Sequence, residues 1–538
     1  MKRRSFFKTA ALGSSIAVIS PLAACSPEEN QTNVISFVDF DLNEITVLQL
    51  QKMMKNEEIT SVKIVQKYLK RIAEVDPYLK AMIEINPDAE TIAAHMDEER
   101  RAGKVRGPLH GIPIVIKDNI DSGDKMMTTA GSMALNGFKA ENDAFIVSKL
   151  REAGAVLLGK TNLSEWANIR STNSSSGWSG RGGQVRNPYV LDRTPCGSSA
   201  GTGAAIAANL CTIGIGTETD GSIVCPSGTN GIVGIKPTLG SWSRHGIIPI
   251  SHSQDTAGPM ARTVADAAIL LGALSAPHNY DEATLDSNRL NITDYTQFLD
   301  PDGLKGKRIG IARQLFGFNA QVDEQLNKSL EILKKQGAVL VDDLEFKERS
   351  EWNNAEWEVL LYELKADLNN YLAEHPNAPV KTLEEIIQYN IEHADVEMPW
   401  FGQEIFVEAQ QKGDLNEEEY LSALKTSKEL SRNAINKTMD ENQLDAIIAP
   451  TNGPAWTIDW VNGDNYGGGS SDFAAISGYP NITVPAGYVH EIPLGLSFFG
   501  RAWSEPVLIE IAYAYEQASK FRKSPKFISS LLAYTADE

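Results

Sequence analysis

The segment from Thr194 to Ser222 reads TPCGSSAGTGAAIAANLCTIGIGTETDGS, with serines near both of its ends. The part "GTGAAIAANL" is rich in alanine and predicts a helix, and "CTIGIGTETD" after it predicts a buried strand. Ser198 precedes the helix and Ser222 follows the strand, so the two elements can form a return path between the serines. Open α/β sheets place their functional sites in loops at the carboxyl ends of strands. The segment therefore predicts an α/β fold with a serine-rich site at the edge of its sheet.

The rest of the chain repeats the alternation of helix and strand. Apolar residues recur at helical spacing between Thr60 and Val75, which predicts an amphipathic helix. Further helices are predicted over residues 143–155 and 322–337. Short apolar runs predict strands over residues 112–118, 156–162, 232–238, 307–313, 338–345 and 444–451. This order favours one α/β sheet with helices on both faces, and the length of the chain allows two domains or one large α/β domain. Residues 348–437 are mostly helical and polar in pattern and are interpreted as an insertion or flank, not a separate domain.

Composition excludes some classes of protein. The 538 residues are 42% hydrophobic and 22% charged, as in ordinary globular proteins, with a formal net charge of −20. A body this acidic, without a basic stripe, repels phosphate backbones, so no nucleic-acid partner is expected. Cysteines at metal-ligand spacing are absent from the sequence, and we predict no metal and no cofactor. Cys196 and Cys225 flank the two serine loops and could meet, but the sequence leaves their pairing open.

The N-terminus is typical of an export signal. "MKRRSFFK" is basic and contains a twin arginine, and the apolar stretch after it is shorter than the roughly 20 residues of a membrane span. The twin arginine resembles Tat-type signals, and Leu22-Ala23-Ala24-Cys25 resembles a bacterial lipobox, in which Cys25 is lipidated. A simple signal cleaved nearby is the alternative. We predict a signal over residues 1–24, a tether over 25–41 and an exported lipoprotein, periplasmic or on the cell surface, that meets the membrane through its lipid anchor only.

A catalytic serine needs a base, and the sequence has no histidine between His110 and His245. Lys117 offers another solution, because it ends the apolar run "IPIVIK". Burial disfavours the ammonium form and can bring the pKa of a lysine toward neutrality. A neutral amine can then take a proton from a hydroxyl, and two serines allow a relay to it. A solvated lysine and ordinary glycine–serine turns are the structural alternative for each segment taken alone.

Taken together, Lys117, the paired serines and the Gly221-Ser222 loop resemble the amidase signature family in order and spacing. Other stretches carry the same likeness, among them "GPLHGIPIVIKDNI", "SQDTAGPMARTVADAA" and "ISGYPNITVPAGY". The resemblance covers roughly residues 42–519. Within the family, "GWSGRGGQVRNPYVLDRTPCGSS" and "TETDGSIVCPS" look most like bacterial peptide amidases.

The resemblance implies a single large α/β domain with one mixed β-sheet covered by helices on both faces, and a role for each of these residues. Ser222 would be the nucleophile, Ser198 the relay serine after a cis peptide bond, and Lys117 the general base. The backbone N–H groups of Thr219, Asp220, Gly221 and Ser222 would form the oxyanion hole.

Around this centre the sequence suggests further contacts. Asn173, Ser174 and Ser199 are predicted to bind substrate, and Trp456, Trp460 and the stretch from Tyr466 are expected in the pocket wall. Asp220 departs from the two glycines that many members carry before the nucleophile. Turned inward, its carboxylate would favour a cationic or amide-rich substrate, and turned outward it would only cap the turn. Both orientations stay open.

The predicted function is an exported amidase that cleaves linear carboxamides, with peptide C-terminal amides as candidate substrates, and releases ammonia or an amine. Its partner would be a small-molecule amide or an amidated peptide, and its oligomeric state is not predicted. The alternatives are the catalytic subunit of an amidotransferase and a surface lipoprotein that binds an amide without turnover. The amidase domain is predicted over residues 42–525, followed by a tail over 526–538.

Overall fold

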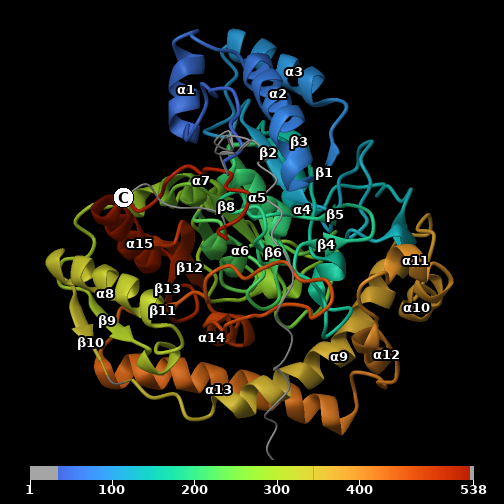
Figure 1. Cartoon of the computed structure of the whole chain (residues 1–538), viewed down its shortest axis with the longest axis vertical. Helices are drawn as coiled ribbons and strands as arrows, with labels where there is room; N and C mark the ends of the chain where they lie inside the picture. Colours follow the sequence, from blue (N-terminus) through green and yellow to red (C-terminus); the bar gives the residue numbers. More distant parts are fainter. Residues whose placement is uncertain (1–33, 343, 533–538) are drawn as a thin grey trace, which may run out of the picture.

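The computed structural model describes residues 34–342 and 344–532, and in them eleven strands form one sheet (Figure 1). Across the sheet the strands are β1 Met82–Ile85, β3 Val156–Thr161, β2 Pro113–Lys117, β6 Ile213–Glu218, β8 Thr256–Ala261, β7 Val233–Lys236, β12 Asn481–Val489, β13 Ile492–Phe499, β11 Ala446–Pro450, β9 Arg308–Ile311 and β10 Val339–Val341. The pairs β2–β3, β2–β6, β9–β10 and β9–β11 are parallel and the others antiparallel. The predicted mixed sheet is confirmed. A separate small ribbon joins β4 Trp178–Ser179 to β5 Gly183–Gln184.

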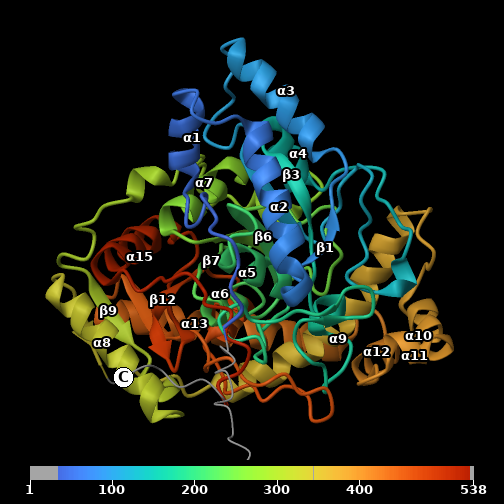
Figure 2. The same ribbon diagram turned by 45° about the horizontal axis from the view of Figure 1, so that its top comes forward.

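The helices form layers around this sheet. They are α1 Val47–Lys55, α2 Ser61–Leu79, α3 Ala89–Arg101, α4 Phe145–Glu152, α5 Ala200–Ala207, α6 Val224–Thr229, α7 Val264–Leu274, α8 Ala320–Lys335, α9 Arg349–Glu374, α10 Leu383–Glu392, α11 Ala394–Glu397, α12 Glu404–Gln410, α13 Glu418–Asn442, α14 Ser471–Ser477 and α15 Glu505–Ser519. In Figures 1 and 2, α1 to α3 lie together at one end of the molecule, away from the long helices α9 and α13. None of the helices in the described part of the chain is long and apolar enough to cross a membrane.

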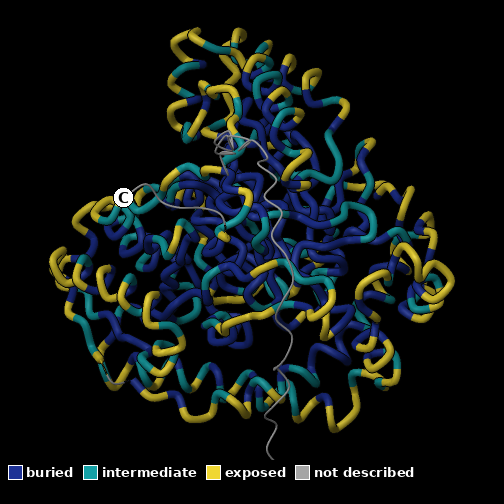
Figure 3. Tube along the Cα trace, in the orientation of Figure 1, coloured by how far each residue is buried: buried dark blue, intermediate teal, exposed yellow. Residues whose placement is uncertain are grey.

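Two short helices lie in the interior because their residues are small. Every residue of α5 and α6 is buried. α5 packs on β2, β3 and β6, and α6 on β7, β12 and β13. At Gly201 a Cβ atom would stand 2.3 Å from the carbonyl oxygens of Ala81 and Asn162, so only glycine permits this approach. α7, α8 and α15 contact β8 or β12 and form a further layer, so helices cover both faces of the sheet as predicted. Figure 3 shows the buried trace at the centre and the exposed trace on the outer helices.

The strongest periodic patterns are confirmed. α2 buries Ile64, Val65, Tyr68, Ile72 and Val75, and begins after Thr60, whose side chain accepts the Lys63 N–H. The six runs predicted as strands correspond to β2, β3, β7, β9, β10 and β11. Residues 348–437 form the helices α9 to α13, and α13 packs along α9 and against α14.

Four strands of the sheet were absent from the sequence prediction. β8 contains a glycine and a proline that are typical of loops, and it is buried along its whole length. The hairpin of β12 and β13 is buried over most of its length, so polar and apolar residues do not alternate along it. β1 is a four-residue strand at the sheet edge.

The two ends of the chain bear on the predicted signal, tether and C-terminal tail. The predicted signal, Cys25 and most of the predicted tether lie outside the described residues. At the other end, Phe527 and Ile528 of the predicted tail pair with the body of the protein. Ile528 forms bridges with Val34 and Val190, and the Phe527 N–H donates to the Pro188 carbonyl. The domain boundaries stay predictions.

Candidate active site

The register of two parallel strands brings the candidate base to the candidate relay. β2 pairs with β6 so that Ile116 lies opposite Ile215, and Lys117 at the end of β2 therefore reaches the end of β6. Parallel neighbours end at the same edge of a sheet, where the loops after them meet. The loop of residues 194–199, which precedes α5, reaches the same edge.

Lys117 is fully buried, and hydroxyl groups surround its amine. The Nζ atom lies 2.8 Å from Ser198 Oγ and 2.9 Å from Thr217 Oγ1. Burial lowers the pKa of Lys117 from its ordinary value of 10.5 to about 7, and the carboxylates of Asp255 and Glu218 oppose that shift. At neutral pH a large fraction of this amine is therefore unprotonated and able to accept a proton. The two carboxylates were not foreseen.

Asp118 does not assist this lysine. It follows Lys117 in the chain and its carboxylate accepts hydrogen bonds from the Thr129 hydroxyl and the Gly131 N–H. Consecutive residues of a strand point to opposite faces. The Asp118 carboxylate therefore points away from Lys117.

The two serines of the pair have different surroundings. The Gly197–Ser198 peptide bond is cis, as the resemblance implied, and the Ser198 hydroxyl accepts a hydrogen bond from the Lys117 amine. The Ser199 hydroxyl instead donates to the Thr217 carbonyl and accepts the Thr217 N–H, at 3.0 and 3.1 Å. Ser199 is fully buried and fastens its loop to β6; it does not line the cavity described below, so the predicted substrate contact is replaced by a structural one.

Ser222 lies in a tight turn between β6 and α6. Gly221 has a φ of 77°, which favours glycine, and the side chain of Ser222 is 8% exposed. Glu218 holds the far side of the turn, because one of its oxygens accepts the N–H groups of Ile223 and Val224 at 2.7 and 2.9 Å. The N–H of Gly221 also faces the Glu218 carboxylate. The other predicted oxyanion donors, on Thr219, Asp220 and Ser222, belong to residues that line the cavity.

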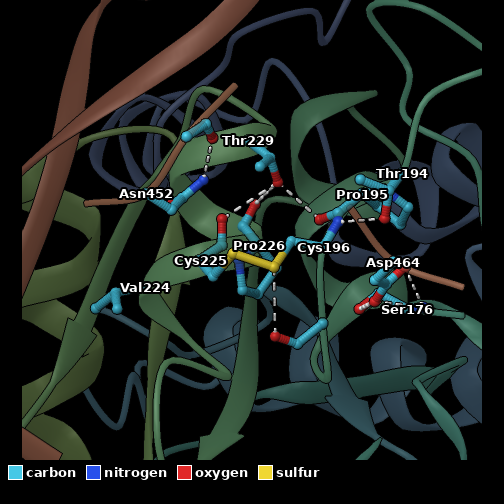
Figure 4. The surroundings of a disulfide bond; sticks show 12 residues. Ser176, Thr194, Pro195, Cys196, Val224, Cys225, Pro226, Thr229, Asn452 and Asp464 are labelled. Carbon is cyan, nitrogen blue, oxygen red and sulfur yellow. Dashed lines mark hydrogen bonds between the residues drawn. A yellow bond between two sulfur atoms is a disulfide. The ribbon is translucent and has the colours of Figure 1, made fainter. Parts of the chain in front are cut away.

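A disulfide joins the loop that contains Ser198 to the start of α6, just after Ser222 (Figure 4). Cys196 and Cys225 are bonded, with 6.0 Å between their Cα atoms, which settles the pairing that the sequence left open. The Thr229 hydroxyl and the Asn230 amide both donate to the Pro195 carbonyl beside the bridge, at 2.8 and 2.9 Å. The loop of Ser198 is therefore fixed to α6, the helix that directly follows Ser222, by a covalent bond and by hydrogen bonds.

A cavity of about 420 Å³ opens over Ser222. Its wall comes from residues 167–176, both serine loops, Ile250, Leu360 of α9 and the segment from Trp456 to Ser471. Of the predicted substrate contacts, Ser174 lines the cavity, whereas Asn173 is exposed outside it and donates to Glu404. Trp456 and Tyr466 line the wall as predicted, whereas Trp460 is not a lining residue and its indole donates to Gln184. Leu360 and Asp464 gave no signal in the sequence, because they reach the site only through tertiary packing.

Asp220 turns toward the cavity. Its side chain contributes to the lining, and its Oδ1 atom is buried without a hydrogen-bond partner. Of the two orientations left open, the structure has the inward one. Burial together with the nearby carboxylate of Asp472 raises the pKa of Asp220 from its ordinary 3.8 to about 7.

One other cluster in the described part of the chain has the composition of a metal site. Ligand atoms of His252, Glu363 and Asp367 lie within 4.8 Å of one another. Their oxygens are already engaged: Glu363 accepts the hydroxyls of Ser251 and Ser253, and Asp367 accepts the His252 backbone N–H. The cluster is a hydrogen-bonded junction between α9 and the loop before β8.

Known proteins are similar to this chain in sequence and in fold. The family model described as Amidase matches residues 63–509. A probable amidase of Arabidopsis thaliana is 42% identical over 499 residues, covering 91% of this chain and 93% of the relative. The crystal structure of a native peptide amidase from Stenotrophomonas maltophilia superposes with a TM-score of 0.86 at 48% identity, covering 91% of this chain and all of that one. The A-type subunit of the glutamyl-tRNA(Gln) amidotransferase of Thermoanaerobacter pseudethanolicus is 32% identical, covering 91% of this chain and 99% of the relative.

Proposed function

The chain belongs to the amidase family and is an amide hydrolase, and we propose that it cleaves linear carboxamides, peptide C-terminal amides among them, with Ser222, Ser198 and Lys117. One observation carries the assignment of residues. A fully buried lysine with a pKa near 7 bonds to Ser198, whose loop is linked by a disulfide to the loop of Ser222. Membership of an enzyme family leaves no support for the alternative of a binding protein without turnover.

In the first half of the reaction, Ser222 Oγ attacks the amide carbonyl carbon. The Ser222 proton passes to Ser198, and the Ser198 proton passes to the neutral amine of Lys117. Backbone N–H groups of Thr219, Asp220 and Ser222 stabilise the oxyanion. The carbon–nitrogen bond then breaks, and the proton held by Lys117 returns through Ser198 to the leaving amine or ammonia.

In the second half, water attacks the Ser222 ester. Its proton travels along the same relay, the ester bond breaks, and Ser222 recovers a proton as the carboxylic acid forms. The sum is one amide and one water converted into one acid and one amine. A base near pKa 7 suits both directions of transfer, since a general base is most effective when its pKa lies near the working pH.

The assignment is tested by labelling and by turnover. Wild type should release ammonia from an amidated peptide and react with a fluorophosphonate probe at Ser222. Ser222→Ala should lose both reactions and keep the wild-type circular dichroism spectrum. Ser287→Ala, at an exposed position, is the matched control and should retain both. Labelling of a different serine in active wild type would contradict the assignment.

We also propose that the enzyme is exported and anchored through Cys25. The basic twin-arginine start and the lipobox-like residues support this, and so does the Cys196–Cys225 bridge, since disulfides persist mainly in oxidising compartments. Mass spectrometry of the mature N-terminus tests the proposal. A lipid-modified Cys25 supports it, and a free N-terminus downstream of Cys25 contradicts lipidation.

The likeness to the A-type subunit of an amidotransferase favours a second function, in which released ammonia passes to a partner. Such an enzyme depends on its partner proteins to use the ammonia. Full turnover of a peptide amide by the isolated chain, with all ammonia free in solution, supports hydrolysis. Turnover only in the presence of added partner proteins supports the transferase.

A further inference from the structure

The charge of the cavity is one-sided. Among the described residues that line it there is no lysine and no arginine, but there are two aspartates, Asp220 and Asp464. Near Ser222 a substrate therefore meets acidic groups without a compensating cation in the wall. Electrostatic complementarity of this kind governs which partner is accepted, because like charges repel and opposite charges attract.

The two aspartates differ in how far their oxygens are already bonded. Asp464 accepts hydrogen bonds from the Ser176 backbone, the Ser176 hydroxyl and the Trp456 indole. Asp220 accepts one from the Ser471 hydroxyl, and its Oδ1 atom has no partner in the protein. A buried acceptor without a partner is costly and is satisfied most simply by a donor on a ligand. Of the two, Asp220 is the lining aspartate that keeps an oxygen without a hydrogen-bond partner.

The charged groups around Asp220 favour a cation beside its carboxylate. Asp472 lies close behind it but is paired with Arg349 through two hydrogen bonds of 2.7 and 2.8 Å. Glu356 lies nearby and accepts the Gln254 amide at 2.8 Å. With Glu218 and Lys236, which also interact with Asp220, two cations thus stand against four carboxyl groups. The raised pKa of Asp220 has the same cause, and a bound cation would relieve it.

We propose that Asp220 determines the substrate class, selecting amides whose amide-bearing residue has a basic side chain and rejecting those with an acidic one. This rests on the proposed function, because it places the scissile carbonyl at Ser222. Asp220 precedes Gly221-Ser222 in the chain and lines the same cavity, so a side chain beside the scissile carbonyl can reach it. The same charge repels the carboxylate product that forms at Ser222, which favours its release.

A set of four N-acetylated amino-acid amides tests the proposal, because acetylation leaves the side chain as the only charge. Acetyl-lysinamide is compared with acetyl-norleucinamide, and the α-amide of acetyl-glutamate with acetyl-glutaminamide. For wild type we expect kcat/KM to be about tenfold higher for lysine than for norleucine, and about tenfold lower for glutamate than for glutamine. In Asp220→Asn both ratios should fall to within about twofold of unity.

Controls separate specificity from other effects. Asp302→Asn removes an exposed carboxylate that is distant in sequence from the cavity-lining residues, and it should keep both wild-type ratios. If Asp220→Asn loses turnover, calorimetric binding of the lysine and norleucine amides to Ser222→Ala, with and without Asp220→Asn, gives the same ratio without chemistry. An unchanged ratio in the asparagine variant, or a wild type that prefers norleucine, overturns the proposal. A wild type that releases ammonia from none of the four amides contradicts the proposed function instead.

Discussion

Lys117 and Lys160 are both fully buried lysines on neighbouring parallel strands, yet they sit in opposite environments. The register pairs Ile116 with Lys160, so Lys160 leaves the sheet on the face opposite Lys117. Lys160 donates to the Ile120 carbonyl and the Thr128 hydroxyl.

The carboxylates nearby differ as well. Those of Asp118, Asp121, Asp124 and Glu84 surround Lys160 and favour its charged form. Lys117 bonds to the Ser198 and Thr217 hydroxyls and to the Thr217 carbonyl, and fewer carboxylates, those of Asp255 and Glu218, favour its charged form. Burial lowers the pKa of both lysines, but the carboxylates around Lys160 suit an ammonium, whereas the hydroxyls around Lys117 suit a proton acceptor. Burial alone therefore does not make a lysine a base; the groups that face its amine decide.

The largest expected effect comes from replacing Lys117. Lys117→Met should lower kcat/KM by about 10³-fold or more, because the serine relay loses its proton acceptor. Its stability should be equal to wild type or higher, since a buried amine is exchanged for an apolar side chain of similar length. Lys117→Arg should not restore activity, because a guanidinium stays protonated. The measurement is steady-state kinetics beside thermal unfolding.

Two outcomes would bear on this prediction. Near-wild-type turnover in Lys117→Arg would exclude the lysine as base. Ser198→Ala is expected to be less damaging than Lys117→Met, because a water molecule can take the place of the relay hydroxyl. An equal or greater loss would show that the hydroxyl itself is indispensable.

The matching change at Lys160 should act on folding. Lys160→Met leaves Asp118 buried with less compensating charge, and we expect the free energy of unfolding to fall by about 3–5 kcal/mol. The folded fraction should keep kcat within about threefold of wild type, since Lys160 faces away from the site. Denaturant unfolding and active-site titration measure the two quantities. A loss of kcat like that of Lys117→Met at normal stability would remove the distinction between the lysines.

The pH dependence of the wild type tests the neutral amine directly. Below a pH of about 7, where Lys117 becomes protonated, kcat/KM should fall about tenfold per pH unit, and at pH 5 it should be about one hundredth of its plateau. The lowered pKa of Lys117 affects the free energy of unfolding with the opposite sign to a lysine in an ordinary ion pair, whose pKa is raised by folding. A lowered lysine pKa disfavours folding fully below pH 7, and this penalty fades as pH rises toward 10.5. An acid limb centred near 4 would point to a carboxylate base instead.

The smallest expected effect comes from removing the disulfide that holds Ser198, the hydrogen-bond partner of Lys117. The double change Cys196→Ser and Cys225→Ser frees the Ser198 loop from the Ser222 loop, and kcat should fall about tenfold with little change in KM. The free energy of unfolding should fall by about 3–4 kcal/mol, because the bridge closes a loop with a sequence separation of 29. Cys211→Ala removes the free buried cysteine and is the control for thiol loss. An unchanged kcat would mean that hydrogen bonds alone position Ser198.

Local sequence predicted much of the fold because several elements repeat apolar residues at one spacing. The pattern before Val75 predicted α2, and short branched runs predicted β2, β3 and β7. β8 was missed because its glycine, proline and small side chains resemble a loop, and only its pairing with β6 and β7 makes it a strand. In the site, residue type and order indicated Lys117, Ser198 and Ser222, since few side chains can serve as nucleophile, relay or base.

The sequence by itself determined the class of fold and the chemistry that the loops of Ser198 and Ser222 could support. Both depend on short segments, in which neighbours along the chain determine the local structure. Only the tertiary structure decided that Asp220 faces the cavity, that Cys196 meets Cys225, and that Ser174 lines the wall while Asn173 lies outside it. It also brought Asp464 and Leu360 to Ser222 from distant parts of the chain. The physical reason is that the direction, burial and pKa of a side chain depend on the groups packed around it, and folding brings those groups together from positions hundreds of residues apart.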